Sequence, residues 1–240
     1  MAAQRYQSVD SLRGCAIVLM VLYHLCFDLN LFHVIKLDFY HDPFWLGGRV
    51  FIVSLFLLLV GISLTLSVRR GLDSPAFRQA FGRRLAWLSI CAMLISLTSY
   101  LMTPSRWIFF GILHFIAVAS VLSLLFVRRP GFGLIVGILL IGLGIFSSFP
   151  LFDRPALQWL GLMTHKPYTD DYVPLVPWFG VVLLGQYIGF RWFGDAAPAV
   201  LVRHYDNRVV AALSWAGRYS LLIYMLHQPI LFGILMLLVG

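Results

Sequence analysis

Seven long apolar segments constrain this chain more than any other feature of its sequence. They span roughly residues 14–35, 45–67, 85–103, 107–127, 131–150, 175–193 and 219–239. A helix needs about 20 predominantly apolar residues to cross a bilayer, and these segments have that length. Strands of a membrane barrel alternate apolar and polar residues over about 10 positions, a pattern that these unbroken runs lack. We therefore predict an all-α, polytopic membrane bundle of about seven transmembrane helices.

The composition excludes the other broad classes of protein. Hydrophobic residues make up 60% of the 240 residues and charged residues only 12%, against about 25% charged residues in a soluble domain. A water-soluble globule, a disordered chain and a fibre are therefore excluded. Since no repeat or soluble segment interrupts the pattern, we expect one integral membrane domain over residues 1–240. The three cysteines fall inside apolar runs, so neither a disulfide nor a metal site is expected.

The cationic residues predict the orientation of the chain. The sequence contains sixteen Arg and two Lys against ten Asp and no Glu, a net charge of +8. With a cytoplasmic N-terminus, thirteen of these eighteen residues fall on inner segments, as the positive-inside rule requires. The outer segments then hold only Lys36, Arg106, Arg154 and Lys166. We therefore predict a cytoplasmic N-terminus and an outer C-terminus, and we assign the charge to topology, with no role in binding nucleic acid.

Two of the inner segments favour short helices in the membrane interface. In the first, Ser74 can cap a helix that Pro75 opens. The second lies near residues 206–215, and Gly217 is expected to close it. The longest outer stretch, residues 151–176, is rich in proline and polar residues and is the best candidate for a lid or acceptor loop.

Five polar side chains fall where lipid should not tolerate them: His24, Asp28, Arg49, His114 and His227. Helix rise places the three histidines about 16, 12 and 14 Å, in chain order, into a hydrocarbon core about 30 Å thick. Such groups usually face the bundle interior or a wet cavity, and they often mark function.

The first apolar helix has a polar stripe. At 100° per residue, Asp10, Arg13, His24 and Asp28 share one face, with Ile17 as its only apolar member. Because His24 and Asp28 are four residues apart, the carboxylate can orient the imidazole. On the last helix, Tyr224 and His227 likewise share a face. The stripe predicts a functional polar site.

Two alternative functions use the same polar residues. Midplane histidines on different helices can ligate a b-type haem, and His24 with His114 or His227 would then serve an electron carrier. A proton-coupled transporter would also need a polar stripe of this kind.

Four stretches of the sequence resemble a known family. They are RYQSVDSLRGCAIVLMVLYHL, GILHFIAVASVL, DYVPLVPWFGVVLLGQYIG and LSWAGRYSLLIYMLHQPIL, which contain Arg5, Asp10, Arg13, Gly14, His24, His114 and His227. In order and spacing they resemble the transmembrane acyltransferases related to heparan-α-glucosaminide N-acetyltransferase, and most of all the short bacterial branch.

The resemblance implies transfer of an acetyl or similar group from acetyl-CoA, supplied by the cytoplasm, to an acceptor across the membrane. It also implies a bacterial inner membrane. The acceptor is expected from the outer loop itself, whose aromatic rings and carboxylates suit an amine or hydroxyl, such as that of a sugar or glycan, better than a phosphate; they belong to Trp159, Tyr168, Tyr172, Asp170 and Asp171. In the lysosomal members a luminal histidine is the base, and His41 falls close to that position. Their first helix has an asparagine where this chain has His24. The sequence leaves open whether His24 or His41 is the base, and whether the protein is a monomer or a homodimer.

Acyl transfer needs a base for the acceptor proton, a donor for the developing oxyanion and cations for the CoA phosphates. The base candidates are His24, oriented by Asp28, and His41. The oxyanion candidates are His227, Tyr224 and Arg49. The cofactor-binding candidates are Arg13, Arg83, Arg84 and Arg218 at the inner face, with His114, Tyr224 and His227 near the midplane. The substrate-binding candidates are Arg49, Trp159, Tyr172 and Trp178.

Overall fold

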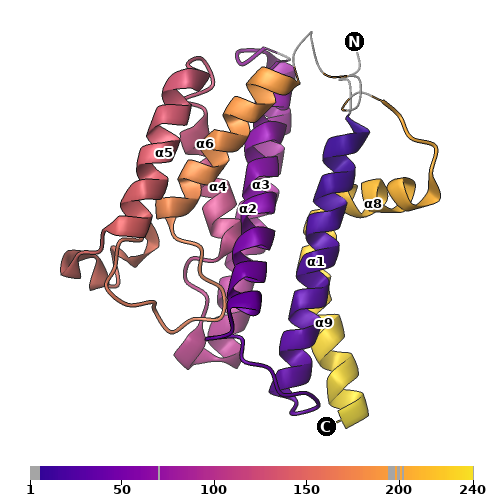
Figure 1. Cartoon of the computed structure of the whole chain (residues 1–240), viewed down its shortest axis with the longest axis vertical. Helices are drawn as coiled ribbons and strands as arrows, with labels where there is room; N and C mark the ends of the chain where they lie inside the picture. The colour runs from indigo at the N-terminus through magenta and orange to yellow at the C-terminus, as the bar shows by residue number, and fades with distance from the viewer. Residues whose placement is uncertain (1–5, 70, 194–197, 199–200, 202, 240) are drawn as a thin grey trace. The chain divides into compact units, whose positions relative to one another are not determined.

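Every regular element in the described part of the chain is helical, which confirms the all-α prediction (Figure 1). The computed structural model describes residues 6–69, 71–193, 198, 201 and 203–239, so Arg5 lies outside it. The longer helices are α1 (Gln7–Leu31), α2 (Pro43–Val68), α3 (Pro75–Met102), α4 (Ile112–Ser123), α5 (Pro130–Phe146), α6 (Leu175–Trp192), α8 (Arg208–Arg218) and α9 (Ser220–Val239). Three short 3-10 helices, η1 (Pro104–Arg106), η2 (Pro150–Asp153) and η3 (Gln158–Leu160), lie in the connections.

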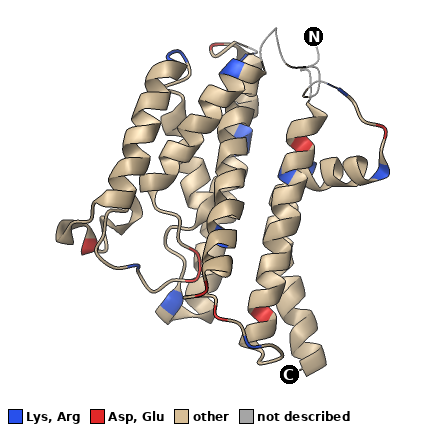
Figure 2. Ribbon diagram, viewed as in Figure 1, with Lys and Arg blue, Asp and Glu red and all other residues tan. Residues whose placement is uncertain are grey.

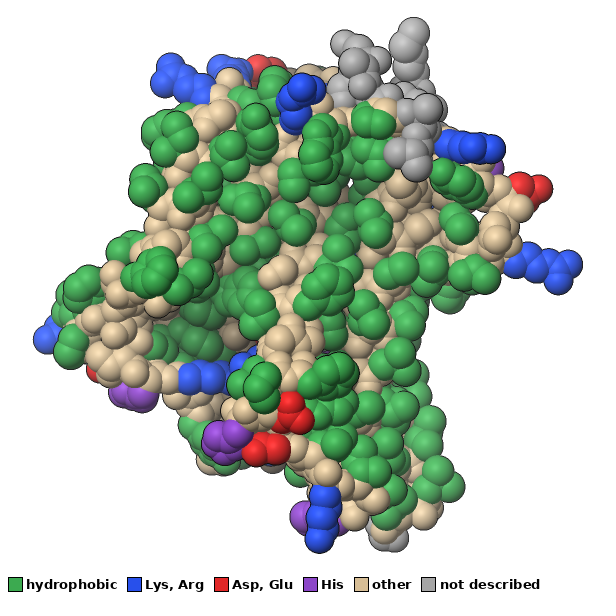
Figure 3. Space-filling view, in the orientation of Figure 1, with side chains coloured by type: hydrophobic (Ala, Val, Ile, Leu, Met, Phe, Trp, Pro, Cys, Tyr) green, Lys and Arg blue, Asp and Glu red, His purple; other side chains and the backbone are tan. Residues whose placement is uncertain are grey.

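Each of the seven predicted apolar segments overlaps one α-helix, although the helix bounds differ from those of the segment. Four of them, α1, α2, α3 and α9, are long and apolar enough to cross a membrane, while α4 and α5 are apolar but shorter. Charged residues gather mainly near the helix ends (Figure 2), and hydrophobic side chains cover most of the visible surface (Figure 3). An apolar surface of this extent is favourable in contact with lipid and unfavourable in contact with water. It therefore supports the prediction of a polytopic membrane protein.

The predicted interfacial helix after Ser74 is part of a longer helix. Ser74 does cap it, since its Oγ accepts a hydrogen bond from the N–H of Phe77 at 3.2 Å, and Pro75 is the first helical residue. The prediction of a separate short helix was wrong, because α3 continues without a break for 28 residues to Met102. The segment between Pro75 and the apolar run contains no second proline, and α3 passes through Gly82 without ending.

The second predicted interfacial helix is α8, and Asn207 caps it by accepting a hydrogen bond from the N–H of Val209 at 2.8 Å. The prediction that Gly217 closes this helix was wrong, since α8 ends at Arg218. Gly217 instead packs directly against the backbone of Asp10 in α1. Its lack of a Cβ serves helix packing and not termination.

The first of two compact units comprises residues 1–59 and 197–240, with α1, α8, α9 and the first part of α2. In this unit α8 crosses α1 at a steep angle, and α9 lies beside α1 (Figure 1). A Cβ at Gly14 would collide with the backbone of Leu213, so only glycines allow the α1/α8 crossing to be this close. Ile17 and Met20 of α1 form an apolar core with Ala216 of α8.

The second unit comprises residues 60–196, with the rest of α2 and α3 to α6. Here α5 and α6 approach closely where Gly137 faces Gly180. The end of α2 is attached to the end of α6 by Arg69, whose guanidinium donates to the backbone carbonyls of Phe193, Gly189 and Phe190.

Candidate active site

Polar side chains of α1 and α9 meet inside the first unit. The imidazole rings of His24 and His227 lie edge to face, with centroids 5.0 Å apart. Asp28 accepts a hydrogen bond at Oδ1 from Nε2 of Gln228, at 3.4 Å. Asp28 is only 1% exposed and His227 8%. We call these four residues the α1/α9 polar cluster.

Each member of the α1/α9 polar cluster has one buried polar atom without a hydrogen-bond partner. These atoms are His24 Nδ1, Asp28 Oδ2, His227 Nε2 and Gln228 Oε1. They are four of the seven such side-chain atoms in the described part of the chain. Leaving a buried polar atom unpaired costs about 1–3 kcal/mol. Four of them in one place indicate a site that binds a polar ligand or water.

The backbone fixes the protonation pattern of His227. Its Nδ1 lies 2.6 Å from the carbonyl oxygen of Tyr224, one turn earlier in α9. Because a carbonyl oxygen can only accept, Nδ1 is the donor and carries the proton. In the neutral ring Nε2 is then unprotonated, and it is the buried atom without a partner.

The structure brings His24 and Asp28 into one cluster but does not join them by a hydrogen bond. Asp28 bonds to Gln228, and the ring of His24 contacts His227 and, at 6.1 Å between centroids, Tyr23. The sequence predicts that Asp28 orients His24 across one turn of α1. In the structure each of these two side chains instead contacts a residue of α9.

His41 lies apart from the α1/α9 polar cluster, in the loop between α1 and α2. Its side chain is 86% exposed and pairs through Nδ1 with Oδ2 of Asp38 at 3.0 Å. Asp38 also accepts backbone hydrogen bonds from Tyr40 and His41. These bonds, chiefly the one from Tyr40, lower the pKa of the Asp38 carboxyl. The cluster member His24 lies seven residues before Leu31, the last residue of α1. About 10 Å of helix therefore separates it from the start of the loop that carries His41.

An aromatic cluster anchors this loop. Phe39 is 3% exposed and packs against Tyr23 and Phe27 of α1 and Trp45 of α2, with centroid distances of 4.4 to 5.4 Å. His41 therefore has a fixed attachment two residues away. Arg49, half-buried on α2, interacts electrostatically with the phenol of Tyr23.

Two of the predicted CoA-binding arginines share a carboxylate. Asp10, 4% exposed, lies 3.1 Å from Arg13 and 3.5 Å from Arg218 of α8, measured between the charged atoms. One carboxylate between two guanidinium groups leaves a net positive charge. Such a charge suits a phosphate.

The other predicted CoA-binding arginines, Arg83 and Arg84, lie exposed on α3 in the second unit. His114, which was predicted with them, is held on both ring nitrogens. The N–H of Gly111 donates to its Nδ1 at 3.3 Å, and its Nε2 lies 3.1 Å from Oγ of Ser96. Since Ser96 donates its own proton to the carbonyl of Ile108, at 2.6 Å, Nε2 of His114 is the donor to Ser96. His114 keeps no nitrogen for a ligand.

Local hydrogen bonds hold two of the predicted substrate-binding aromatics, Tyr172 and Trp159, in the loop between α5 and α6. The hydroxyl of Tyr172 donates to the carbonyl of Gln158 at 2.6 Å, and burial raises the pKa of Tyr172. Trp159 donates to the carbonyl of Ala156 at 3.1 Å. Trp178 lies half-buried near the start of α6.

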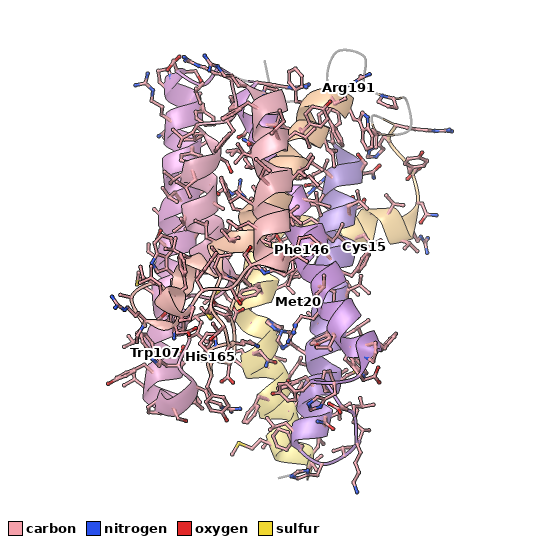
Figure 4. All side chains as sticks on the ribbon, turned by 60° about the vertical axis from the view of Figure 1, so that its left-hand side comes forward. Cys15, Met20, Trp107, Phe146, His165 and Arg191 are labelled. Carbon is pink, nitrogen blue, oxygen red and sulfur yellow. The ribbon has the colours of Figure 1, made fainter. Side chains whose placement is uncertain are left out.

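An open pocket of about 650 Å³ lies beside this loop in the second unit. Figure 4 labels two of its lining residues, Trp107 and His165, at the same end of the helices. Gln158, Lys166 and Tyr168 also line it, whereas Trp159, Tyr172 and Trp178 do not. The pocket includes residues of the loop that the sequence indicated as an acceptor loop, and it also includes Trp107, which comes from a different connection.

The geometry disfavours the haem alternative. An iron bound by His24 and His227 would need a porphyrin between two rings whose centroids are 5.0 Å apart and meet edge to face. The other proposed ligand, His114, has both nitrogens engaged.

Gln228 was the cluster member that the sequence prediction missed. An amide next to His227, nine residues into an apolar helix, is itself a polar group that lipid disfavours. Applying the same test to amides as to charges would have found it.

Comparison with known proteins identifies the family. The family model described as heparan-alpha-glucosaminide N-acetyltransferase, catalytic, matches residues 5–229, a range that contains the whole α1/α9 polar cluster. No curated protein and no solved structure matches the chain. The family model covers almost the entire sequence, and the chain therefore belongs to the heparan-α-glucosaminide N-acetyltransferase catalytic family of membrane acetyltransferases.

Proposed function

We propose that this protein moves an acetyl or short acyl group from cytoplasmic acyl-CoA to an amine or hydroxyl on the outer side of a bacterial inner membrane. The acceptor that we expect is a sugar or glycan. Family membership supports the reaction class. The observation that carries the proposal is the α1/α9 polar cluster, whose buried unpaired atoms are the kind of group that acyl transfer uses.

The residues present suit this reaction. The acceptor must lose a proton as it attacks, and an imidazole with a free buried nitrogen can take it. His24 and His227 both have such a nitrogen. Arg49, in the same unit, is a fixed cation that can stabilise developing negative charge on the thioester oxygen.

The arginines of the inner side suit the phosphates of CoA. Arg13 and Arg218 surround Asp10 with a surplus of positive charge in the first unit, and Arg83 and Arg84 lie exposed in the second unit. Arginine forms paired, charge-assisted hydrogen bonds to phosphate. We expect each of the two pairs to offer positive charge to the phosphates of acyl-CoA and so to raise its affinity.

Sealed vesicles of known orientation test the proposal. Acyl-CoA is supplied to one face and acceptor sugars to the other, and the release of free thiol and of acylated sugar is measured. We expect turnover when acyl-CoA meets the cytoplasmic face. Turnover only from the outer face would overturn the sidedness. An absence of transfer from either face, with amine and hydroxyl sugars alike, would overturn the activity.

Replacing Arg83 and Arg84 by alanine tests the CoA contact. Removing charge-assisted bonds that form equally in the ground and transition states should raise the KM for acyl-CoA about tenfold and leave kcat and the acceptor KM nearly unchanged. The exposed Arg128, which pairs with Asp73, provides a matched control. An unchanged KM for acyl-CoA would remove these two residues from the CoA site.

A further inference from the structure

We propose that the α1/α9 polar cluster binds the acceptor and that His227, through Nε2, is the base that takes the acceptor proton. This inference rests on the proposed function. It replaces both candidates that the sequence left open, His24 and His41, and it moves His227 from the CoA side of the site to the acceptor side.

The first argument compares the ring nitrogens of the histidines. His41 is exposed and pairs with Asp38, and both nitrogens of His114 are engaged in the second unit. His24 has an unpaired Nδ1, but no hydrogen bond in the described structure fixes which of its nitrogens carries the proton. His227 differs from His24 because the Tyr224 carbonyl holds the proton on Nδ1, and it differs from His41 because its other nitrogen is buried in the α1/α9 polar cluster. Its unpaired Nε2 is therefore an acceptor before the reaction begins.

The second argument concerns the kind of ligand that the cluster lacks. Gln228 uses its amide nitrogen to bond Asp28, so its unpaired atom, Oε1, can only accept. The unpaired Oδ2 of the Asp28 carboxylate also accepts, as does Nε2 of His227. Three buried acceptors without donors favour a ligand that supplies N–H or O–H groups. An amine or a sugar hydroxyl fits this pattern, whereas a phosphate or a carboxylate does not.

The reaction that follows is balanced without any further reactant. Nε2 of His227 takes the proton as the acceptor nitrogen or oxygen forms a bond to the thioester carbonyl carbon. The carbon–sulfur bond then breaks, and the imidazolium returns the proton to the leaving thiolate. The products are the acylated acceptor and free CoA, and no group changes oxidation state.

Two substitutions separate the base from the hydrogen bond that holds it. His227→Asn keeps an N–H near the position of Nδ1, where it can donate to the Tyr224 carbonyl, and removes Nε2. His33→Asn is the matched control, because His33 is in the exposed loop with φ +60°, a conformation that asparagine accepts. Full-length protein in proteoliposomes is assayed with acetyl-CoA and a panel of amino sugars and neutral sugars.

We expect His227→Asn to lower kcat by about 10²- to 10⁴-fold, with the KM for acetyl-CoA and the thermal midpoint unchanged. His227→Ala should regain part of its activity when imidazole is added, which a purely structural role would not allow. In the rescued variant the acid limb of the wild-type pH–rate profile should be replaced by one that follows the titration of the added imidazole. The titratable groups in ring contact with His227 are His24 of α1 and Tyr224 of its own helix, and Asp28 bonds to the neighbouring Gln228. His24→Asn is therefore profiled in parallel.

The outcomes distinguish this inference from the proposed function. If the wild type transfers acetyl groups and His227→Asn does so within threefold, His227 is not the base, although the enzyme class stands. If imidazole fails to rescue His227→Ala while His24→Asn removes the acid limb, the base is His24. If the wild type transfers nothing to any sugar, the proposed function itself has failed.

Discussion

His227 and His114 are both histidines inside apolar helices, yet their surroundings differ in one decisive respect. His114 donates from one ring nitrogen and accepts at the other, both to groups of its own unit. His227 satisfies one nitrogen on the Tyr224 carbonyl and leaves the other buried and unpaired. A ring with both nitrogens bonded holds a fold together, whereas a ring with one orphaned nitrogen is available to a ligand. Position in the membrane alone does not separate these roles.

The largest expected effect is on the stability that His114 provides. His114→Ala leaves the N–H of Gly111 without its acceptor and Ser96 without its donor, and should cost about 2–3 kcal/mol. For a chain of this size that lowers the thermal midpoint by roughly 4–12 °C. The kcat of the protein that remains folded should not change. The exposed His204 serves as the control, since His204→Ala should leave the midpoint unchanged. A loss of kcat without a loss of stability would give His114 a role in binding or catalysis.

Asp28→Asn should raise stability and lower activity, whereas His114→Ala lowers stability and leaves kcat unchanged. A buried carboxylate with one unpaired oxygen is poorly compensated, so a neutral amide of the same shape should stabilise the protein, by about 1 kcal/mol. The same change removes an acceptor from the α1/α9 polar cluster, and activity should fall about tenfold or more. Thermal melts and acyl-transfer assays on the same preparation check both. A variant that melts earlier and keeps its specific activity would make Asp28 a structural residue like His114.

The sequence predicts features that neighbouring residues determine, and it does not predict contacts between residues far apart in the chain. The apolar runs, the Ser74 cap and the buried polar positions follow from local patterns. The partner of Asp28 does not. Spacing along one helix favours His24, but the hydrogen bond goes to Gln228, 200 residues away. The sequence also does not show that both ring nitrogens of His114 are hydrogen-bonded, because its partner Ser96 belongs to another helix.

The pocket and the extent of α3 were missed for related reasons. Trp107 and Gln158 line one pocket although they come from separate connections, so only the fold brings them together. The arginine-rich segment 75–84 is polar, and hydropathy therefore separated it from the apolar run that follows. Helix propensity does not depend on polarity, and α3 runs through both.

The smallest effect concerns the loop that holds His41. The pKa of Asp38 is lowered from 3.8, so its anchoring of the Tyr40 and His41 amides is complete above that value. The anchoring is lost as the pH falls below about 4 and passes through the still lower pKa of the folded state. At neutral pH, Asp38→Asn should increase hydrogen exchange at these two amides about two- to tenfold and leave α1 unaffected. Equal exchange in both proteins would show that Phe39 alone fixes the loop.

The distance in sequence between the two halves of the α1/α9 polar cluster has a consequence for biosynthesis. His24 and Asp28 enter the membrane with the first helix, and their partners on α9 follow 200 residues later. At about 5–20 residues per second, translation needs roughly 10–40 s to cover that gap. During this time α1 must retain a carboxylate and an imidazole in the membrane without the helix that receives them. A ribosome that stalls before α9 therefore leaves behind a chain whose His24 and Asp28 lack their α9 partners, and we expect quality-control proteases to recognise it by this polar surface.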